Sequence, residues 1–165
     1  MFEKGFPTAA YVSSTALIAI VRDNKLYVAN AGDSKAILLR YKADLGGYQL
    51  IKLSKTFTIN KKEEQERMKK QFPGERDIFQ CVKQPIGIQC YVKGGLQPTR
   101  SFGDFRLKHR EFNFHNYRED LGYRLPIPTF SGPYITSTPD IQIHLLTCLA
   151  VAQASGLFSR SNRFG

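Results

Sequence analysis

The sequence predicts an α+β fold that consists mainly of antiparallel strands. Between residues 14 and 53, four short apolar segments rich in β-branched side chains are separated by turn signals. The pattern then changes to a charged, helix-like segment at residues 60–72, and shorter strand-like segments follow. A run of strands followed by a helix, rather than regular strand–helix alternation, is typical of α+β domains.

The first four strands are expected to form an antiparallel meander with short connections. Asp23 and Asn24 provide the first turn, because both residues tolerate the left-handed backbone. Gly32 provides the second bend, and Gly46 with Gly47 provides the third. The strands themselves are expected over residues 14–21, 25–30, 35–40 and 48–53.

A single helix is expected after the meander. Asn60 followed by Glu63 has the spacing of a capping box, with Asn60 as the N-cap. Met68 and Phe72 lie four residues apart and mark the buried side, and Pro73 ends the helix. The sequence therefore predicts a helix that extends to about Phe72 and packs on the sheet.

The remainder of the chain is predicted to be less regular. Strands are expected at residues 78–82, 89–92 and 141–145. Residues 105–130 are rich in aromatic, basic and proline residues, and we expect irregular structure with one helical turn. Residues 148–165 contain no acidic residue and are expected to form a disordered tail.

Composition and charge limit the function classes. The chain has 165 residues, and Lys+Arg 24 against Asp+Glu 14 gives a net charge of +10. The basic residues are scattered and often adjoin acidic ones, so a nucleic-acid-binding function rests on charge alone, and we expect no nucleic-acid partner. No apolar run approaches the roughly 18 residues that a membrane helix needs, and the N-terminus does not resemble a signal peptide. We therefore expect no membrane association and a location in the cytoplasm or the nucleus.

The thiols and imidazoles suggest no catalytic or metal site. Cys81, Cys90 and Cys148 are odd in number and widely spaced, without the spacing of a zinc site, so we expect reduced cysteines. The three histidines form no recognisable nucleophile–base pattern, and each is expected to be structural or solvated. They are His109, His115 and His144.

Two carboxylates are more informative, because each directly follows a glycine at a predicted bend. These are Asp33 and Asp104. A carboxylate on a tight bend at a strand end can point away from the core, and its hard oxygen atoms suit Mg²⁺ or Mn²⁺. The alternative is that each side chain accepts hydrogen bonds from its own loop.

Four motifs, in the correct order, resemble those of the metal-dependent (type 2C) protein serine/threonine phosphatases. Residues 14–16 (STA) and 25–36 (KLYVANAGDSKA) resemble the central strands of that family. Residues 60–69 resemble its helix, and residues 95–104 (GLQPTRSFGD) resemble its segment ending in Phe-Gly-Asp. Residues 133–140 resemble a later strand, and the resemblance covers about residues 8–147. The wording of residues 96–108 (LQPTRSFGDFRLK) and the long insert before Pro133 are similar to the branch that includes pyruvate dehydrogenase phosphatase.

The resemblance implies a fold, a reaction and a site. The fold would be an incomplete αββα sandwich, with two antiparallel sheets face to face and helices outside. The family reaction uses two Mg²⁺ or Mn²⁺ ions that bridge a hydroxide, which attacks a phosphoserine or phosphothreonine protein substrate in line. Asp33 matches a ligand of an accessory metal ion. Arg100 and Asp104 match the segment that shapes the site, and Asp104 is not expected to be a metal ligand.

The chain also departs from the family pattern. The family's Asp-Gly-His-Gly-Gly motif, upstream of the first strand, and its Asp-Gly-Leu-Trp-Asp motif, after the last strand, do not occur in this sequence. We therefore expect residues 1–147 to form a partial phosphatase domain and residues 148–165 a divergent tail. The expected function is a protein phosphatase of the Mg²⁺/Mn²⁺ type, represented by a chain that lacks the core metal ligands and is inactive alone. The alternative is a non-catalytic pseudophosphatase or phosphoprotein-binding module.

Overall fold

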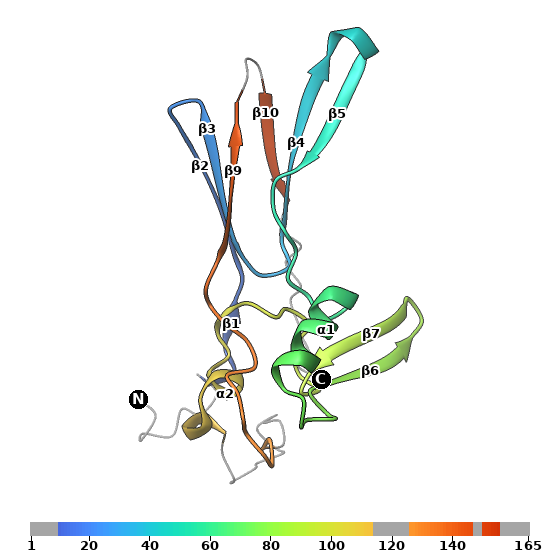
Figure 1. Cartoon of the computed structure of the whole chain (residues 1–165), viewed down its shortest axis with the longest axis vertical. Coiled ribbons are helices and arrows are strands. Elements are labelled where there is room, and N and C mark those ends of the chain that lie inside the picture. The colour runs from blue at the N-terminus through green and yellow to red at the C-terminus, as the bar shows by residue number, and fades with distance from the viewer. Residues whose placement is uncertain (1–9, 114–125, 147–149, 156–165) are drawn as a thin grey trace, which may run out of the picture.

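A computed structural model describes residues 10–113, 126–146 and 150–155 of the chain. Its upper half consists of two three-stranded antiparallel sheets (Figure 1). One sheet has the order β2–β3–β9, and the other has the order β10–β4–β5. The strands are β2 (Ala16–Arg22), β3 (Lys25–Ala31), β4 (Lys35–Lys42), β5 (Gly47–Lys52), β9 (Asp140–Leu145) and β10 (Ala150–Ser155). The prediction of an α+β fold with antiparallel sheets is confirmed.

The two sheets face each other across a small apolar core. Alternate residues of β3 and β4 point inward, because side chains along a strand alternate between its two faces. The core consists of Leu26, Val28, Ala36, Leu38 and Leu53, all buried. Across this core, His144 Nε2 lies 3.2 Å from the carbonyl oxygen of Leu53. His144 is therefore structural, as the sequence predicts.

The four early strands form as expected, but they do not form one meander. β2 pairs with β3, and β4 pairs with β5. β3 pairs on its other side with β9, and β4 pairs on its other side with β10. The bend at residues 32–34 therefore carries the chain from one sheet to the other, and the prediction of a continuous four-stranded meander is wrong at this point.

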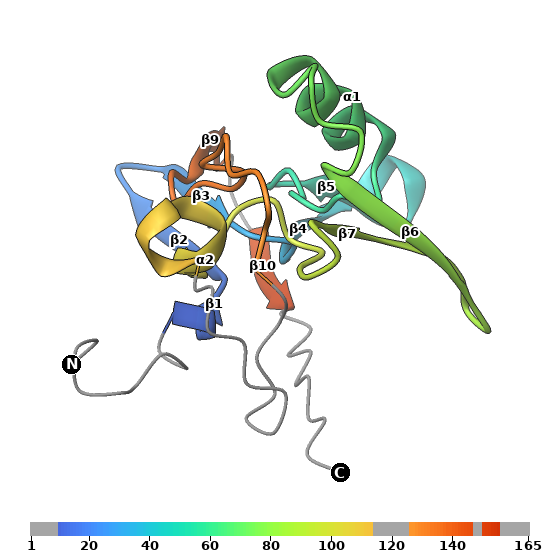
Figure 2. The same ribbon diagram turned by 90° about the horizontal axis from the view of Figure 1, so that it is seen from below.

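The lower half contains α1, α2 (Phe105–Lys108) and a hairpin (Figure 1), whereas the short η3 helix (Ala43–Leu45) joins β4 to β5 in the upper half; Figure 2 shows the molecule from below. Helix α1 (Lys62–Gln71) lies against the hairpin of β6 (Phe79–Gln84) and β7 (Gly87–Val92). Met68 of α1 and Phe72, which directly follows the helix, belong to a second core that includes Val92 and Tyr134. The helix therefore packs against the hairpin and the 127–135 segment, which corrects the expectation that it packs on the large sheets.

The start of α1 also differs from the prediction. The N-cap residue is Lys61, and its side chain makes no capping hydrogen bond. The Asn60 side chain instead accepts a hydrogen bond from the backbone N–H of Cys90 at 2.7 Å. A contact with the hairpin has therefore replaced the predicted capping box.

Two cysteines of this hairpin form a disulfide. Cys81 and Cys90 lie opposite each other in the β6–β7 register, and a bond joins their sulfur atoms. The expectation of three reduced cysteines is therefore wrong for this pair, because hairpin pairing brings together two residues that are nine positions apart. Cys148 lies outside the described residues.

The later segments agree with the sequence in part. β1 (Ser13–Ser14) pairs with β8 (Phe102–Gly103), and the short helices α2 (Phe105–Lys108) and η4 (Arg110–Phe112) follow. Residues 114–125, which complete the predicted irregular segment and include His115, lie outside the described residues. Within the tail that was expected to be disordered, β10 is a strand paired with β4, so that expectation is wrong for residues 150–155.

The outer faces of both large sheets carry exposed apolar side chains. On the β2–β3–β9 sheet, Ile20 and Ile143 are 57% and 58% exposed. On the β10–β4–β5 sheet, Tyr48 and Leu50 are 73% and 55% exposed. Within the described residues, no helix is long and apolar enough to cross a membrane.

Candidate functional site

Asp33 lies on the bend between β3 and β4, and the buried Asn30 side chain organises this bend. The amide nitrogen of Asn30 donates hydrogen bonds to the carbonyl oxygens of Gly32 at 3.1 Å, Ser34 at 2.9 Å and Lys55 at 2.7 Å. Gly32 has no room for a side chain, because a Cβ atom there would overlap the Thr15 side chain. Asp33 is therefore held half-buried on a rigid bend between the two sheets.

The residues around Asp33 do not fit the pair of metal ions that the family resemblance implies. Two divalent ions require several converging carboxylates. Among the described residues, no group of three or more His, Cys, Asp or Glu side chains could hold a metal ion. Asp140 pairs with Asn30 across β3 and β9, but its carboxylate already contacts Lys55 at 3.5 Å and Gln142 at 2.7 Å. We therefore derive no catalytic step through a metal ion for this chain.

Arg100 links the 99–104 segment to the strand region before β9. Its guanidinium lies 3.8 Å from the centre of the Phe57 ring, and its Nη1 donates to the carbonyl oxygen of Thr138 at 2.8 Å. The backbone of Arg100 also forms a bridge with Thr136. These contacts fix the segment in place, and the site-shaping role implied for Arg100 stays a prediction.

Asp104 is buried at the start of α2. Its carboxylate accepts a hydrogen bond from the Ser101 hydroxyl at 2.6 Å, and its backbone N–H donates to the carbonyl oxygen of Val12 at 3.0 Å. Asp104 has a left-handed backbone with φ 48°, and the preceding Gly103 has φ 73°. A side chain at Gly103 would overlap the backbone of Val12. The Asp104 carboxylate is thus engaged within its own loop, which was the alternative considered for both bend carboxylates.

Glu64 is a buried carboxylate that the sequence analysis did not single out. It accepts hydrogen bonds from Arg67 Nη2 at 2.9 Å and from the Thr99 hydroxyl at 2.5 Å. Burial raises the pKa of Glu64, but the hydrogen bonds from Arg67 and Thr99 and the charges of Arg67 and Arg100 outweigh it and leave the pKa below its ordinary value. Glu64 precedes the buried Met68 by four residues, so helical periodicity could have placed it on the buried face.

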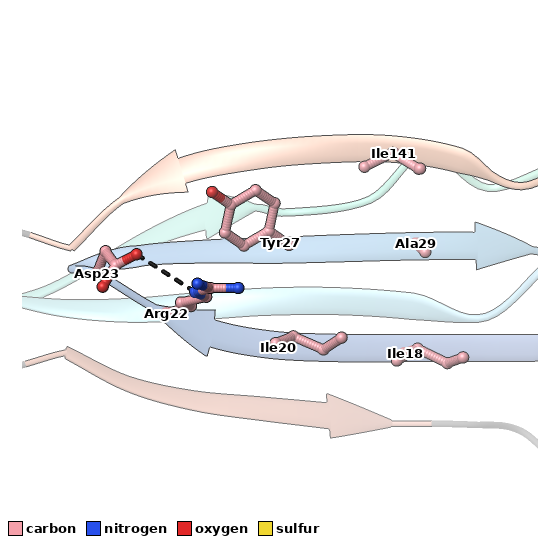
Figure 3. A pocket seen from close by; sticks show the side chains of 7 residues that line it. All are labelled: Ile18, Ile20, Arg22, Asp23, Tyr27, Ala29 and Ile141. Carbon is pink, nitrogen blue, oxygen red and sulfur yellow. Dashed lines mark ion pairs between the residues drawn. The ribbon is translucent and has the colours of Figure 1, made fainter.

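A shallow cavity of about 520 Å³ lies on the outer face of the β2–β3–β9 sheet (Figure 3). Ile18, Ile20 and Ile141 form much of its lining. The ion pair between Arg22 and Asp23, at 3.4 Å, lies at its end. The lining is largely apolar, and its two charged side chains pair with each other.

Comparison with known proteins assigns the family. The family model described as Protein phosphatase 2C matches residues 4–148. The chain belongs to the protein phosphatase 2C family. The family predicted from the four motifs is therefore confirmed. The matched part of the chain includes the Asp33 bend, the 99–104 segment and helix α1.

Individual relatives support this assignment. The chain is 36% identical over 142 residues to a probable protein phosphatase 2C 64 of Arabidopsis thaliana, covering 85% of this chain and 33% of that protein. It is 31% identical over 155 residues to a probable protein phosphatase 2C 36 of Oryza sativa subsp. japonica, covering 92% and 38%. The chain thus spans little more than a third of the length of these curated relatives.

A solved structure is similar in fold. The crystal structure of a serine-threonine phosphatase 2C from Toxoplasma gondii superposes with a TM-score of 0.51 at 15% identity, covering 86% of this chain and 40% of that one. At this level of identity the likeness shows the fold alone. It supports the prediction that the two facing sheets are those of an incomplete phosphatase sandwich.

Proposed function

We propose that this protein phosphatase 2C chain is the central part of a Mg²⁺/Mn²⁺-dependent protein serine/threonine phosphatase and is inactive by itself. The family match over residues 4–148 carries the phosphatase assignment. Two observations support the inactivity. The sequence lacks the core metal motifs, and Asp33 has no partners for a metal site among the described residues. In a complete domain, the substrate would be a phosphoserine or phosphothreonine protein.

Sequencing of the full-length transcript tests the partial-domain proposal. We expect an in-frame continuation that encodes Asp-Gly upstream of residue 1 and Asp-Gly-Leu-Trp-Asp in place of the divergent tail. A mature transcript with stop codons directly on both sides would contradict the proposal. The finer assignment to the pyruvate dehydrogenase phosphatase branch remains a proposal that rests on the wording of residues 96–108.

A second candidate is a phosphoprotein-binding module without catalysis. A cavity lined by the basic side chains of Arg67 and Lys108 and by the hydroxyl of Ser137 favours this candidate. Turnover of a phosphopeptide with Mn²⁺ distinguishes the two, because only a catalytic chain releases phosphate.

Location in the cytoplasm or the nucleus also remains a proposal. The Cys81–Cys90 disulfide counts against this proposal, because disulfides are rare in these compartments. Fractionation of cells that express the chain tests the location. Recovery in the cytosolic or nuclear fraction is expected, and recovery in a secreted or membrane-enclosed fraction would contradict the proposal.

A further inference from the structure

A cavity of about 440 Å³ lies where four segments of the lower half converge. Helix α1, the 99–104 segment, the end of α2 and residues 133–137 each supply part of its lining. Its volume is within the range of small-ligand sites, which is roughly 300–1,000 Å³. It is separate from the cavity of Figure 3, which lies on the outer face of a large sheet.

Three side chains that can carry positive charge line this cavity, and each is held by a neighbour. Arg67 Nε and Nη2 bond to Glu64, and Arg67 Nη1 donates to Gln71 at 3.0 Å. Lys108 Nζ donates to the carbonyl oxygen of Ser101 at 2.6 Å. His109 Nδ1 lies 3.8 Å from a carboxylate oxygen of Glu111. The three lining groups are Arg67, Lys108 and His109.

These contacts leave hydrogen-bond donors for a ligand. A guanidinium has five N–H donors, and the bonds to Glu64 and Gln71 use three of them, so Arg67 keeps two. An ammonium has three donors, and the hydrogen bond from Lys108 to Ser101 uses one. The exposed Ser137 adds a hydroxyl to the same lining. Among the described residues that line this cavity none is a carboxylate, although Glu64 accepts hydrogen bonds from two of them, Arg67 and Thr99.

Lys108 is half-buried, so its ammonium has lost part of its hydration. Burial lowers the pKa of the Lys108 ammonium, and the nearby Asp104 carboxylate partly opposes that effect. A bound dianion would replace solvation that the ammonium has lost. Pro133, Tyr134 and Ile135 provide an apolar wall beside these groups.

We propose that this cavity binds the phosphoryl group of a phosphoserine or phosphothreonine peptide, with Lys108 and Arg67 as its ligands and without a metal ion. The choice of a phosphopeptide rests on the proposed function, whereas the anion preference rests on the lining alone. The cationic groups share one cavity instead of following a face of the molecule, which suits a single phosphate group better than a nucleic-acid backbone.

The test measures binding in the presence of EDTA, so that neither a metal ion nor turnover is required. Fluorescence anisotropy compares a labelled phosphothreonine peptide with its unphosphorylated form on the full 165-residue chain. We expect the phosphorylated form to bind more tightly and inorganic phosphate to compete with it. Lys108→Gln should raise the Kd about tenfold, which corresponds to the loss of one charge-assisted hydrogen bond.

Lys62→Gln is the matched control, because it removes the same charge from an exposed position on α1 outside the cavity. Circular dichroism checks that both variants fold. Equal affinity for the two peptides would overturn the proposal. So would an equal effect of the two substitutions, or competition by a single-stranded oligonucleotide stronger than that by the unlabelled phosphopeptide. Because this assay requires no hydrolysis, its failure is distinguishable from failure of the phosphatase assignment.

Discussion

Replacement of Asn30 by leucine should destabilise the bend that carries Asp33. Asn30 is fully buried, and its amide nitrogen bonds to three carbonyl oxygens. The carbonyl oxygen of Gly32 also accepts from the backbone N–H of Phe57 at 3.0 Å, so it keeps a partner after the substitution. The carbonyl oxygens of Ser34 and Lys55 lose the Asn30 bond.

The expected loss can be estimated from these two acceptors. A buried acceptor that loses its partner costs about 1–3 kcal/mol. Both bonds are only partly buried, which favours the lower half of that range. Asn30 Oδ1 has no partner among the described residues, so its removal recovers part of the cost. We expect Asn30→Leu to lower the free energy of unfolding by about 2–3 kcal/mol.

The assay is urea unfolding followed by far-ultraviolet circular dichroism, because the chain contains no tryptophan. Gln49→Leu on β5 is the matched control, since it makes the same kind of exchange at an exposed position. The control should change the stability by less than about 0.5 kcal/mol. If Asn30→Leu behaved like this control, the conclusion that Asn30 organises the bend would be refuted.

Reduction of the Cys81–Cys90 disulfide should lower the free energy of unfolding by about 2 kcal/mol, because the bond closes a short loop in the unfolded chain. Cys81→Ser should show the same loss and no further response to reductant, and an unchanged urea midpoint after reduction would contradict this. The lowered pKa of Glu64 stabilises the fold above the ordinary pKa of 4.5, and this stabilisation is lost as the pH falls through the lowered folded-state pKa. Glu64→Gln should therefore flatten the acid side of the stability–pH curve, and a curve as steep as that of the unsubstituted chain would refute the assignment. Ile20→Lys combined with Ile143→Lys should raise the soluble fraction on expression about two-fold, because both isoleucines are exposed on one sheet face, and an unchanged fraction would show that this face does not limit solubility.

Local patterns were sufficient to predict most strands, because period-two alternation and turn residues act over a few positions. They could not show that the bend at Gly32 joins two sheets, since the partners β9 and β10 lie more than a hundred residues further along the chain. The same limit explains the capping error. The residue type of Asn60 and its spacing to Glu63 are typical of an N-cap, but the Asn60 side chain instead accepts a hydrogen bond from the backbone N–H of Cys90.

The candidate site was predictable to a similar extent. Asp33 and Asp104 were found because a glycine precedes each at a predicted bend, and Arg100 was found through the family resemblance. The structure places all three on rigid segments. Asn30 and Glu64 were missed because the sequence analysis placed Asn30 in a strand and Glu64 in a helix without asking whether either side chain is buried. Asn30 continues the inward-facing series of Leu26 and Val28, so an amide at that position already indicates a buried polar role.

The most direct test of the central claim is hydrolysis of a phosphothreonine peptide by residues 1–165 in millimolar Mn²⁺, compared with the Asp33→Ala variant. A single motif carboxylate cannot hold two divalent ions at close range, because each ion needs several oxygen ligands. We predict no measurable release of phosphate from either protein and at most weak Mn²⁺ binding that Asp33→Ala removes. Clear turnover by the unsubstituted chain that Asp33→Ala abolishes would contradict the account and would mean that residues of this chain complete a metal site.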